Sequence, residues 1–438
     1  MIPHTTLLNA RWIIPVEPRG QVLEHHTLVM TGTRIEAVLP VEEAQRRYPQ
    51  ANTVALPHHV LIPGLINLHT HAAMTLMRGL ADDTPLMTWL KDHIWPAESK
   101  YLSENYVFDG TELATAEMIR SGTTCFADMY FYHDVAARAA LKSGMRAALG
   151  GAVLEFPTPY AADAEAYLAK GVATREEFLA EPRLKLMIAP HAPYTVSDKT
   201  FHRIVTIASE MDIAVMMHIH ETATEVTQGE QEHGVRPIER LNRLGVLGPN
   251  LIAVHCVHLN ALEIELFARA GVHVAHCPVS NLKLASGIAP IKAMLEAGIN
   301  VGIGTDGTAS NNRLDMLAET RLAAMLQKGV SGDAATLPAW QALEMATLNA
   351  AKALGWDREI GSLVPGKAAD MVAIDLSSLE TQPCYDPASH VFYAAGREHV
   401  THSWVNGELL LDNRVLTKLD SDELKAKAAI WQQRIREH

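Results

Sequence analysis

Cysteine is scarce in this chain of 438 residues, and the paired spacing C-x-x-C does not occur. Four scattered cysteines in a chain of this length do not make a disulfide framework. We therefore expect reduced core cysteines and a cytoplasmic protein. The N-terminal segment also lacks a basic start followed by a long apolar run, so the sequence predicts no export signal.

Long apolar runs and excess positive charge are also missing. No stretch reaches the ~18 apolar residues of a membrane span, so no membrane association is expected. Lys and Arg number 37 against 50 Asp and Glu, and the net charge of −13 disfavours a nucleic-acid groove. Hydrophobic residues make up 48% of the chain, enough for a large core. The length exceeds the roughly 250–300 residues of a single core, which indicates two structural units.

Short apolar runs alternate with longer amphipathic stretches through the middle of the chain, which is typical of repeated βα units. The runs are almost continuously apolar, as expected for strands buried on both faces. Ser197 and Asn260 can begin helices that follow such runs, and Gly271 can end one. Eight such units predict an α/β fold with a (β/α)8 TIM barrel over residues 61–360. The predicted strands are 61–69, 123–129, 146–154, 184–191, 214–221, 251–257, 272–278 and 301–306.

The flanking segments have a different pattern. Residues 1–60 and 361–438 contain short apolar runs broken by turn residues, and Asn406-Gly407 between two of them is a strong hairpin signal. Because both ends of the chain are rich in strands, we expect them to form one small β-sandwich domain. A C-terminal helix completes this predicted unit.

Polar residues occur where an apolar barrel core would not place them, at the ends of the predicted strands. The carboxyl ends of the strands converge on one face of a TIM barrel and build its active site. A single buried histidine would mean little, but a whole set on one rim predicts a catalytic centre. The set consists of His69, His71, Asp128, His191, His218, His220, Glu221, His255, His276 and Asp306.

His69 and His71 can bind one metal ion together, because side chains on a strand alternate and both imidazoles then lie on one face. His218 can add a third nitrogen and Asp306 an oxygen, with water at the open position of a catalytic zinc site. The alternative for Asp306 is an N-cap in the G-T-D-G turn, without a role in metal binding.

Glu221 follows His218 by three residues, so it can stand beside a metal-bound water and transfer protons. The alternative is a surface glutamate at the start of the next helix, which is the interpretation given to Glu225 and Glu230. His255 can either hydrogen-bond the attacking hydroxide or orient the carboxylate of Asp306.

Several motifs resemble the amidohydrolase superfamily, in its branch of triazine hydrolases and S-adenosylhomocysteine/5'-methylthioadenosine deaminases. These motifs are PGLINLHTH (63–71), MHIHE (217–221), VHCVHL (254–259), HCPVSN (276–281) and GTDGTASN (304–311). The resemblance covers nearly the whole chain. It implies that His69, His71, His218 and Asp306 are the metal ligands, and that Glu221 and His255 complete the catalytic set. It also implies that Trp89, Glu98, His191 and Ser310 contact the nucleoside, with Glu98 accepting the ribose hydroxyls.

The resemblance carries three further expectations. Binuclear members have a modified lysine where this chain has His191, so one divalent ion is expected, with zinc favoured over iron, manganese or nickel. Related chlorohydrolases tend to lack the shuttle glutamate, so the presence of Glu221 favours deamination of a purine nucleoside at C6. Family members often form homo-oligomers, and one is expected here.

Three alternatives remain at this stage. A chlorohydrolase or guanine-type hydrolase would share the metal site, but a free-base enzyme has no use for Glu98. A nucleic-acid deaminase would show H-x-E with P-C-x-x-C, which this sequence lacks. A non-enzymatic scaffold of the same fold would be expected to have lost ligands, whereas all four are present.

The 5' substituent of the nucleoside is the last point on which the sequence bears. Relatives that accept S-adenosylhomocysteine commonly carry an arginine after the third strand, where this chain has Gly151, and the resemblance therefore places Gly151 among the substrate-binding residues. No Lys or Arg lies between Arg146 and Lys170. Met74, Met77 and Phe156 offer apolar groups instead. We therefore expect 5'-methylthioadenosine to be preferred, unless Arg78 or a neighbouring subunit supplies a cation.

Overall fold

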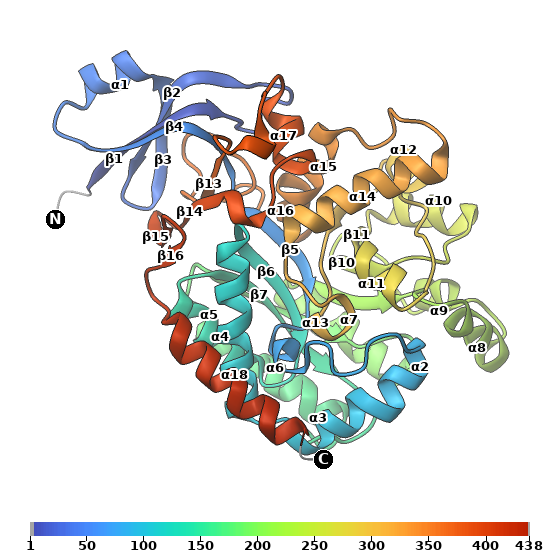
Figure 1. Ribbon diagram of the computed structural model, residues 1–438. Coiled ribbons are helices and arrows are strands. Elements are labelled where there is room, and N and C mark those ends of the chain that lie inside the picture. Colours follow the sequence, from blue (N-terminus) through green and yellow to red (C-terminus); the bar gives the residue numbers. More distant parts are fainter. Residues whose placement is uncertain (1–3, 437–438) are drawn as a thin grey trace.

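The computed structural model describes residues 4–436 and contains two eight-stranded sheets, one of them parallel and nearly closed into a barrel (Figure 1). The other sheet combines strands from both ends of the chain. The predicted fold class, a TIM barrel with a β-domain built from the two termini, is therefore confirmed. Within the described residues, no helix has the length and apolar character needed to cross a membrane.

The barrel strands follow one another in sequence order around the sheet. All residues of the first three are buried, which explains why the sequence runs are continuously apolar rather than alternating. Each of the eight predicted strands corresponds to one of these strands. The barrel strands are β5 (Leu65–Thr70), β6 (Thr123–Tyr130), β7 (Arg146–Val153), β8 (Leu184–Pro190), β9 (Val215–Ile219), β10 (Leu251–His255), β11 (His273–His276) and β12 (Asn300–Ile303).

The first predicted strand, 61–69, is wrong in one respect, because it is divided between the two sheets at Gly64. Residues up to Pro63 belong to β4 (Asn52–Pro63) in the other sheet, and β5 begins at Leu65. A Cβ at Gly64 would lie 2.0 Å from Oγ1 of Thr124, so only glycine fits where the chain crosses from one sheet to the other.

The barrel closes between its first and last strands through a few specific hydrogen bonds. The N–H of Asp306 donates to the carbonyl oxygen of His69 at 2.9 Å. The side chain of Asn67 accepts from the N–H of Thr305 at 2.9 Å and donates to its hydroxyl at 2.7 Å. A Cβ at Gly304 would lie 2.7 Å from the backbone nitrogen of His69. This closure brings the first and last predicted metal ligands together.

Helices surround the barrel and carry the predicted caps. Ser197 accepts from the N–H of Thr200, and Asn260 forms a capping box with Glu263. Gly271 ends its helix at a φ of 73°. The helices that follow the strands are α4 (Glu104–Arg120), α5 (His133–Ser143), α6 (Ala164–Phe178), α7 (Asp198–Met211), α8 (Ala223–His233), α9 (Pro237–Arg243), α10 (Ala261–Ala270), α11 (Pro278–Lys283), α12 (Ile291–Glu296), α13 (Thr308–Asn311), α14 (Met316–Ser331), α15 (Ala339–Ala346) and α16 (Leu348–Ala353).

The second sheet places the N-terminal strands beside the C-terminal ones, with β4 paired to β13. The predicted hairpin at Asn406-Gly407 is confirmed, with φ values of 51° and 77° between two antiparallel strands. The order is β16-β15-β14-β13-β4-β1-β2-β3. Besides β4, the strands are β1 (Thr5–Ile13), β2 (Leu23–Thr31), β3 (Arg34–Pro40), β13 (Met371–Asp375), β14 (Val400–Val405), β15 (Glu408–Asp412) and β16 (Val415–Leu416).

The predicted C-terminal helix is α18 (Ser421–Arg436), and it packs on the barrel. Figure 1 shows it in red beside α4. Trp431 makes an edge contact with Tyr106, and its Nε1 donates to Asp109 at 2.9 Å. This helix therefore covers the barrel rather than the small sheet, and the predicted domain boundaries stay a prediction.

Candidate metal centre and active site

One cavity of about 250 Å³ opens at the carboxyl ends of the barrel strands. Much of its lining is apolar or aromatic and comes from three short helices and from the segments after β6 and β7. The short helices are α2 (Leu86–Thr88), η2 (Trp89–Ile94) and α3 (Trp95–Tyr101). The polar residues at strand ends that line the cavity are His71, His191, His218, Glu221, His255 and Asp306.

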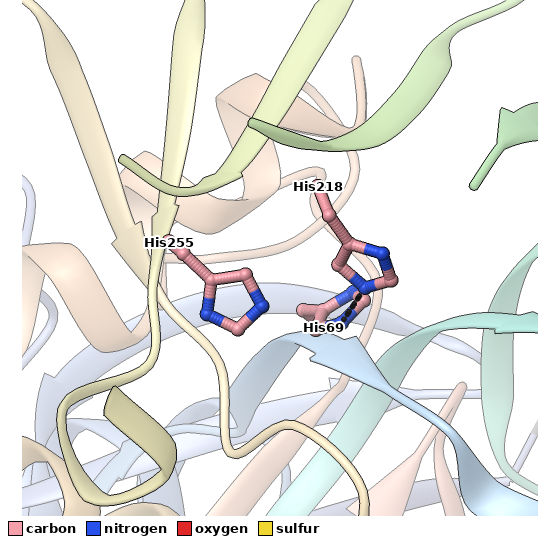
Figure 2. A group of neighbouring side chains, drawn as sticks. All are labelled: His69, His218 and His255. Atoms are coloured by element: carbon pink, nitrogen blue, oxygen red, sulfur yellow. Dashed lines mark hydrogen bonds between the residues drawn. The ribbon is translucent and has the colours of Figure 1, made fainter. Parts of the chain in front are cut away.

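Three histidines and one aspartate meet beside this cavity. Nε2 of His69 lies 3.4 Å from Oδ1 of Asp306, and Nε2 of His71 lies 3.2 Å from the same oxygen. Nε2 of His218 is 3.2 Å from Nε2 of His69. Figure 2 shows the rings of His69, His218 and His255 turned toward one another. The cluster thus presents ring nitrogens and one carboxylate oxygen to a shared volume.

The other ring nitrogens fix how two of these imidazoles point. Nδ1 of His71 donates to the carbonyl oxygen of Met129 at 2.6 Å, and Nδ1 of His69 lies 3.3 Å from Sδ of Met216. A proton on Nδ1 leaves the Nε2 lone pair facing the shared volume. Burial lowers the pKa of His69 to about 4 and the pKa of His218 well below its ordinary value, so both are neutral at pH 7.

This donor set fits a divalent cation. Neutral imidazoles with one carboxylate are ligands that zinc takes, and a fifth group can occupy an open position. Burial lowers the pKa of His71, but the hydrogen bond and charge of Asp306, the bond to the Met129 carbonyl and the charge of Asp128 together outweigh burial and raise that pKa to about 9. The carboxylate therefore favours positive charge at this point. His69, His218 and His255 also form a group whose ring nitrogens lie within 4.8 Å of one another.

The backbone at the rim is strained. His220, His255 and Asp306 have φ values of 52°, 71° and 64°, which are uncommon for residues other than glycine. Such conformations cost on the order of 1–3 kcal/mol each and persist where the surrounding structure imposes them, often at functional sites. These three residues lie at or just after the ends of β9, β10 and β12, so the strain is concentrated at the rim that carries the candidate site.

Glu221 is buried and faces the histidine cluster. Its Oε2 lies 3.9 Å from Nε2 of His255, and its Oε1 accepts from the hydroxyl of Ser286 at 3.5 Å. Burial raises the pKa of Glu221, which suits a group that must both take and give a proton. The surface interpretation is wrong for Glu225, whose buried carboxylate accepts from the backbone N–H groups of His220 and Glu221 at 2.8 and 2.9 Å.

A second carboxylate lies on the opposite wall of the cavity, from α3. Oε1 of Glu98 accepts from the hydroxyl of Tyr130 at 2.7 Å, and burial raises the pKa of Glu98. Nε1 of Trp89, from η2, is buried with no hydrogen-bond partner among residues 4–436. The cavity therefore offers one oriented carboxylate and one free donor away from the histidines.

Comparison with known proteins decides the family. The amidohydrolase family pattern matches residues 60–410. The chain belongs to the amidohydrolase family. It is 46% identical to a 5-methylthioadenosine/S-adenosylhomocysteine deaminase of Teredinibacter turnerae, over 98% of this chain and 97% of that protein. It is 45% identical to the protein of the same name from Saccharophagus degradans, over 99% and 97% of the two chains.

Two solved structures share the fold of this chain. An adenosine deaminase from Xanthomonas campestris with bound zinc superposes with a TM-score of 0.98 at 46% identity, with all of both chains covered. Atrazine chlorohydrolase from Arthrobacter aurescens superposes with a TM-score of 0.91, over 98% and 100% of the two chains. That second likeness, at 22% identity, shows the fold alone. This chain is thus a metal-dependent hydrolase of the amidohydrolase family.

Two residues predicted to contact substrate lie elsewhere in the structure. Gly151 is not among the residues that line the cavity, and a Cβ there would lie 2.7 Å from the ring of His133, because alternate residues of β7 face opposite sides. Its neighbour Ala152 lines the cavity instead. Ser310 also lies outside the lining, and its hydroxyl donates to Oδ2 of Asp306 at 2.8 Å. Trp89, Glu98 and His191 do line it.

Sequence reasoning missed several residues of the site. Tyr130 directly follows the second predicted strand, 123–129, and was not singled out, although it orients Glu98. Asn281 lies in the quoted HCPVSN motif, yet its contact with His255 was not foreseen. Asp128 was noted at the rim, and it lies outside the cavity lining, where it accepts from Thr70 and the N–H of Ala72 on either side of His71.

Proposed function

We propose that this chain catalyses hydrolytic deamination of an adenine nucleoside, with 5'-methylthioadenosine as its preferred substrate and 5'-methylthioinosine and ammonia as products. The observation that carries the proposal is the convergence of His69, His71, His218 and Asp306 beside a buried glutamate, in a cavity that is otherwise largely apolar. Relatives at 45% and 46% identity bear the name of deaminases of this kind.

We propose that these four residues hold one divalent ion, and that the ion is zinc. A zinc ion in such a site acts as a Lewis acid and lowers the pKa of water toward 7. His191 lies beside His218, with ring centroids 5.0 Å apart, and its ring cannot supply the anionic oxygen of the modified lysine that the resemblance associates with binuclear members. Burial lowers the pKa of His191 to about 4, so it contributes a neutral ring.

Glu221 carries the protons in this proposal. Its carboxylate takes a proton from the attacking water and delivers it to ring N1 while the new carbon–oxygen bond forms at C6. The negative charge that would otherwise build on the ring is neutralised in the same step. Glu221 then relays the second proton of the water to the amino group, the C6–N bond breaks, and ammonia leaves. Burial raises the pKa of Glu221, which makes its carboxylate a stronger base for the first of these proton transfers.

His255 and Asp306 would orient the nucleophile. Nδ1 of His255 donates to Oδ1 of Asn281 at 2.9 Å, so its Nε2 can accept a hydrogen bond on the cavity side. Oδ1 of Asp306 faces the histidines and is also held by the N–H of Gly307 at 2.8 Å. Between them these groups would orient the attacking oxygen through hydrogen bonds that are already positioned.

The ribose would bind on the opposite wall. Tyr130 occupies Oε1 of Glu98, so Oε2 is available for the sugar hydroxyls. The buried indole N–H of Trp89 is an unused donor for the same ligand. A buried polar atom without a partner costs free energy, which a bound nucleoside would recover.

The residues that line the cavity favour a nucleoside with an apolar 5' substituent, such as the methylthio group. Among the residues that the structure describes, no Lys or Arg lines the cavity, whereas Met74, Leu154 and Phe156 do. Arg146 forms a buried ion pair with Asp370. Arg78 pairs with Glu117, so neither arginine is free for the carboxylate of S-adenosylhomocysteine. Met77, also expected on this wall, is buried outside the cavity lining.

The test is kcat/KM for 5'-methylthioadenosine, adenosine and S-adenosylhomocysteine, measured on protein of known metal content. We expect about one zinc per chain. We also expect kcat/KM to be highest for 5'-methylthioadenosine, because the cavity wall is apolar. Equal or better use of S-adenosylhomocysteine would refute the pocket argument. Guanine and a chlorotriazine belong in the same panel, because turnover of either without nucleoside deamination would favour the alternative hydrolases.

A further inference from the structure

The HCPVSN motif (276–281) runs from the end of β11 into α11, and the function proposed above does not use it directly. Ser280 and Asn281, adjacent on this helix, are 0% and 1% exposed and do not line the cavity. Each nevertheless makes a hydrogen bond to a residue that does. The two contacts reach two different members of the site.

Ser280 contacts the carboxylate of Asp306. Its hydroxyl donates to Oδ2 at 2.6 Å, and the hydroxyl of Ser310 donates to the same oxygen at 2.8 Å. The terminal torsion of an aspartate is broad, so its two oxygens are easily exchanged unless neighbours distinguish them. With both hydroxyls on Oδ2, Oδ1 is left to face His69 and His71.

Asn281 contacts the ring of His255. Its Oδ1 accepts from Nδ1 of the ring at 2.9 Å, which places the proton on Nδ1 and leaves Nε2 as an acceptor 3.9 Å from Oε2 of Glu221. Nδ2 of Asn281 is buried and has no hydrogen-bond partner within residues 4–436. A buried N–H group without a partner lowers the stability of the fold, so packing does not explain an amide at this position, whereas a role at the site does.

A buried carboxylate from another helix holds α11 in place. Glu319, on α14, accepts from the N–H of Val279 at 2.9 Å and from Nδ2 of Asn311 at 2.8 Å. Asn311 belongs to α13, the helix that also carries Ser310. The segments that supply the two hydroxyls to Asp306 are thus tied to each other through one side chain.

We propose that Ser280 and Asn281 are positioning residues: Ser280, with Ser310, sets which oxygen of Asp306 faces the metal site, and Asn281 fixes the tautomer of His255. This inference rests on the proposed function, because it assumes the roles given there to Asp306 and His255. A positioning contact of this kind typically contributes about 10–100-fold in metal affinity or activity.

The first experiment measures zinc affinity by competition with a chelator. Ser280→Ala and Ser310→Ala should each weaken binding moderately, because one hydroxyl remains on Oδ2, and the double variant should lose about 10–100-fold. Leu282→Ala is the matched control, since its side chain lies on the same helix and is 41% exposed. Unchanged zinc affinity in the double variant would overturn the role of Ser280.

The second experiment tests whether position 281 needs a hydrogen-bond acceptor or only a side chain of this size. Asn281→Asp keeps an oxygen that can only accept, whereas Asn281→Leu removes it at similar volume. We expect the Leu variant to lose about 10–100-fold in kcat with KM nearly unchanged, and the Asp variant to recover most of that loss. Full activity in the Leu variant would refute the proposal, as would equal inactivity of both variants with unchanged thermal stability.

Asp306→Ala distinguishes failure of this inference from failure of the proposed function. If that variant still binds zinc like the original protein, the ligand assignment itself is wrong. If it loses zinc while the double variant of Ser280 and Ser310 does not, the ligand assignment stands and only the positioning role of Ser280 fails.

Discussion

Replacing Glu221 with glutamine removes one proton-carrying group and almost nothing else. The substitution keeps the volume of the side chain and an oxygen for the hydroxyl of Ser286, which lies 3.5 Å from Oε1. A positioned general acid–base group contributes about 10²–10⁴-fold to the rate. At about 1.36 kcal/mol per factor of ten, this raises the barrier by about 2.7–5.4 kcal/mol. We expect kcat to fall by that factor and KM to change little.

The assay is steady-state ammonia release from 5'-methylthioadenosine, with zinc measured on the same preparation. Glu230→Gln is the matched control, because it makes the same chemical change on exposed residue 230 of α8 and should leave kcat unaltered. If Glu221→Gln retained its zinc and more than about a tenth of the original kcat, Glu221 could not be the proton carrier.

Two further predictions concern the metal ligands and the fold. His69→Ala and Asp306→Ala should lose zinc and activity together, measured by metal analysis after gel filtration, and a full equivalent of zinc in either would refute the ligand set. Arg146→Met should lower stability by about 3–5 kcal/mol in denaturant unfolding, because it leaves a buried carboxylate without its partner. Arg146→Met with Asp370→Leu should recover much of that loss, and no recovery would contradict the ion-pair explanation.

The sequence predicted the barrel because its strands are buried on both faces, and such strands are recognisable as continuous apolar runs. It could not locate the point where the chain passes between the two sheets. The run 61–69 stays apolar across Gly64, and the break depends on the closeness of Thr124, a contact between distant segments. The position of α18 escaped prediction for the same reason, since only its packing on α4 places it on the barrel.

Site residues could be predicted from the sequence where the alternation of side chains along a strand alone determines their position. His69 and His71 are two apart on one strand, and the structure brings both to Asp306. Gly151 and Ser310 were assigned to the substrate site by resemblance. Gly151 faces away from the cavity because of the pleat of its strand, and the hydroxyl of Ser310 is directed to Asp306 by a hydrogen bond. Asn281 reaches the site only through its hydrogen bond to His255, and the spacing of residues in the sequence does not indicate an indirect contact of this kind.

The apolar wall for the 5' substituent can be tested by adding the charge that it lacks. Phe156 lines the cavity, is 41% exposed and packs at an angle against Trp95, so a longer polar side chain has room there.

An arginine at this position could pair bidentately with the carboxylate of S-adenosylhomocysteine, and hydrogen bonds to charged groups contribute about 1.5–3 kcal/mol. We therefore expect Phe156→Arg to raise kcat/KM for S-adenosylhomocysteine relative to 5'-methylthioadenosine by about 10-fold or more. Phe156→Leu is the control, because it trims the wall without adding charge and should leave that ratio nearly unchanged. An unaltered ratio in Phe156→Arg, with zinc and folding intact, would show that the 5' group does not approach this wall.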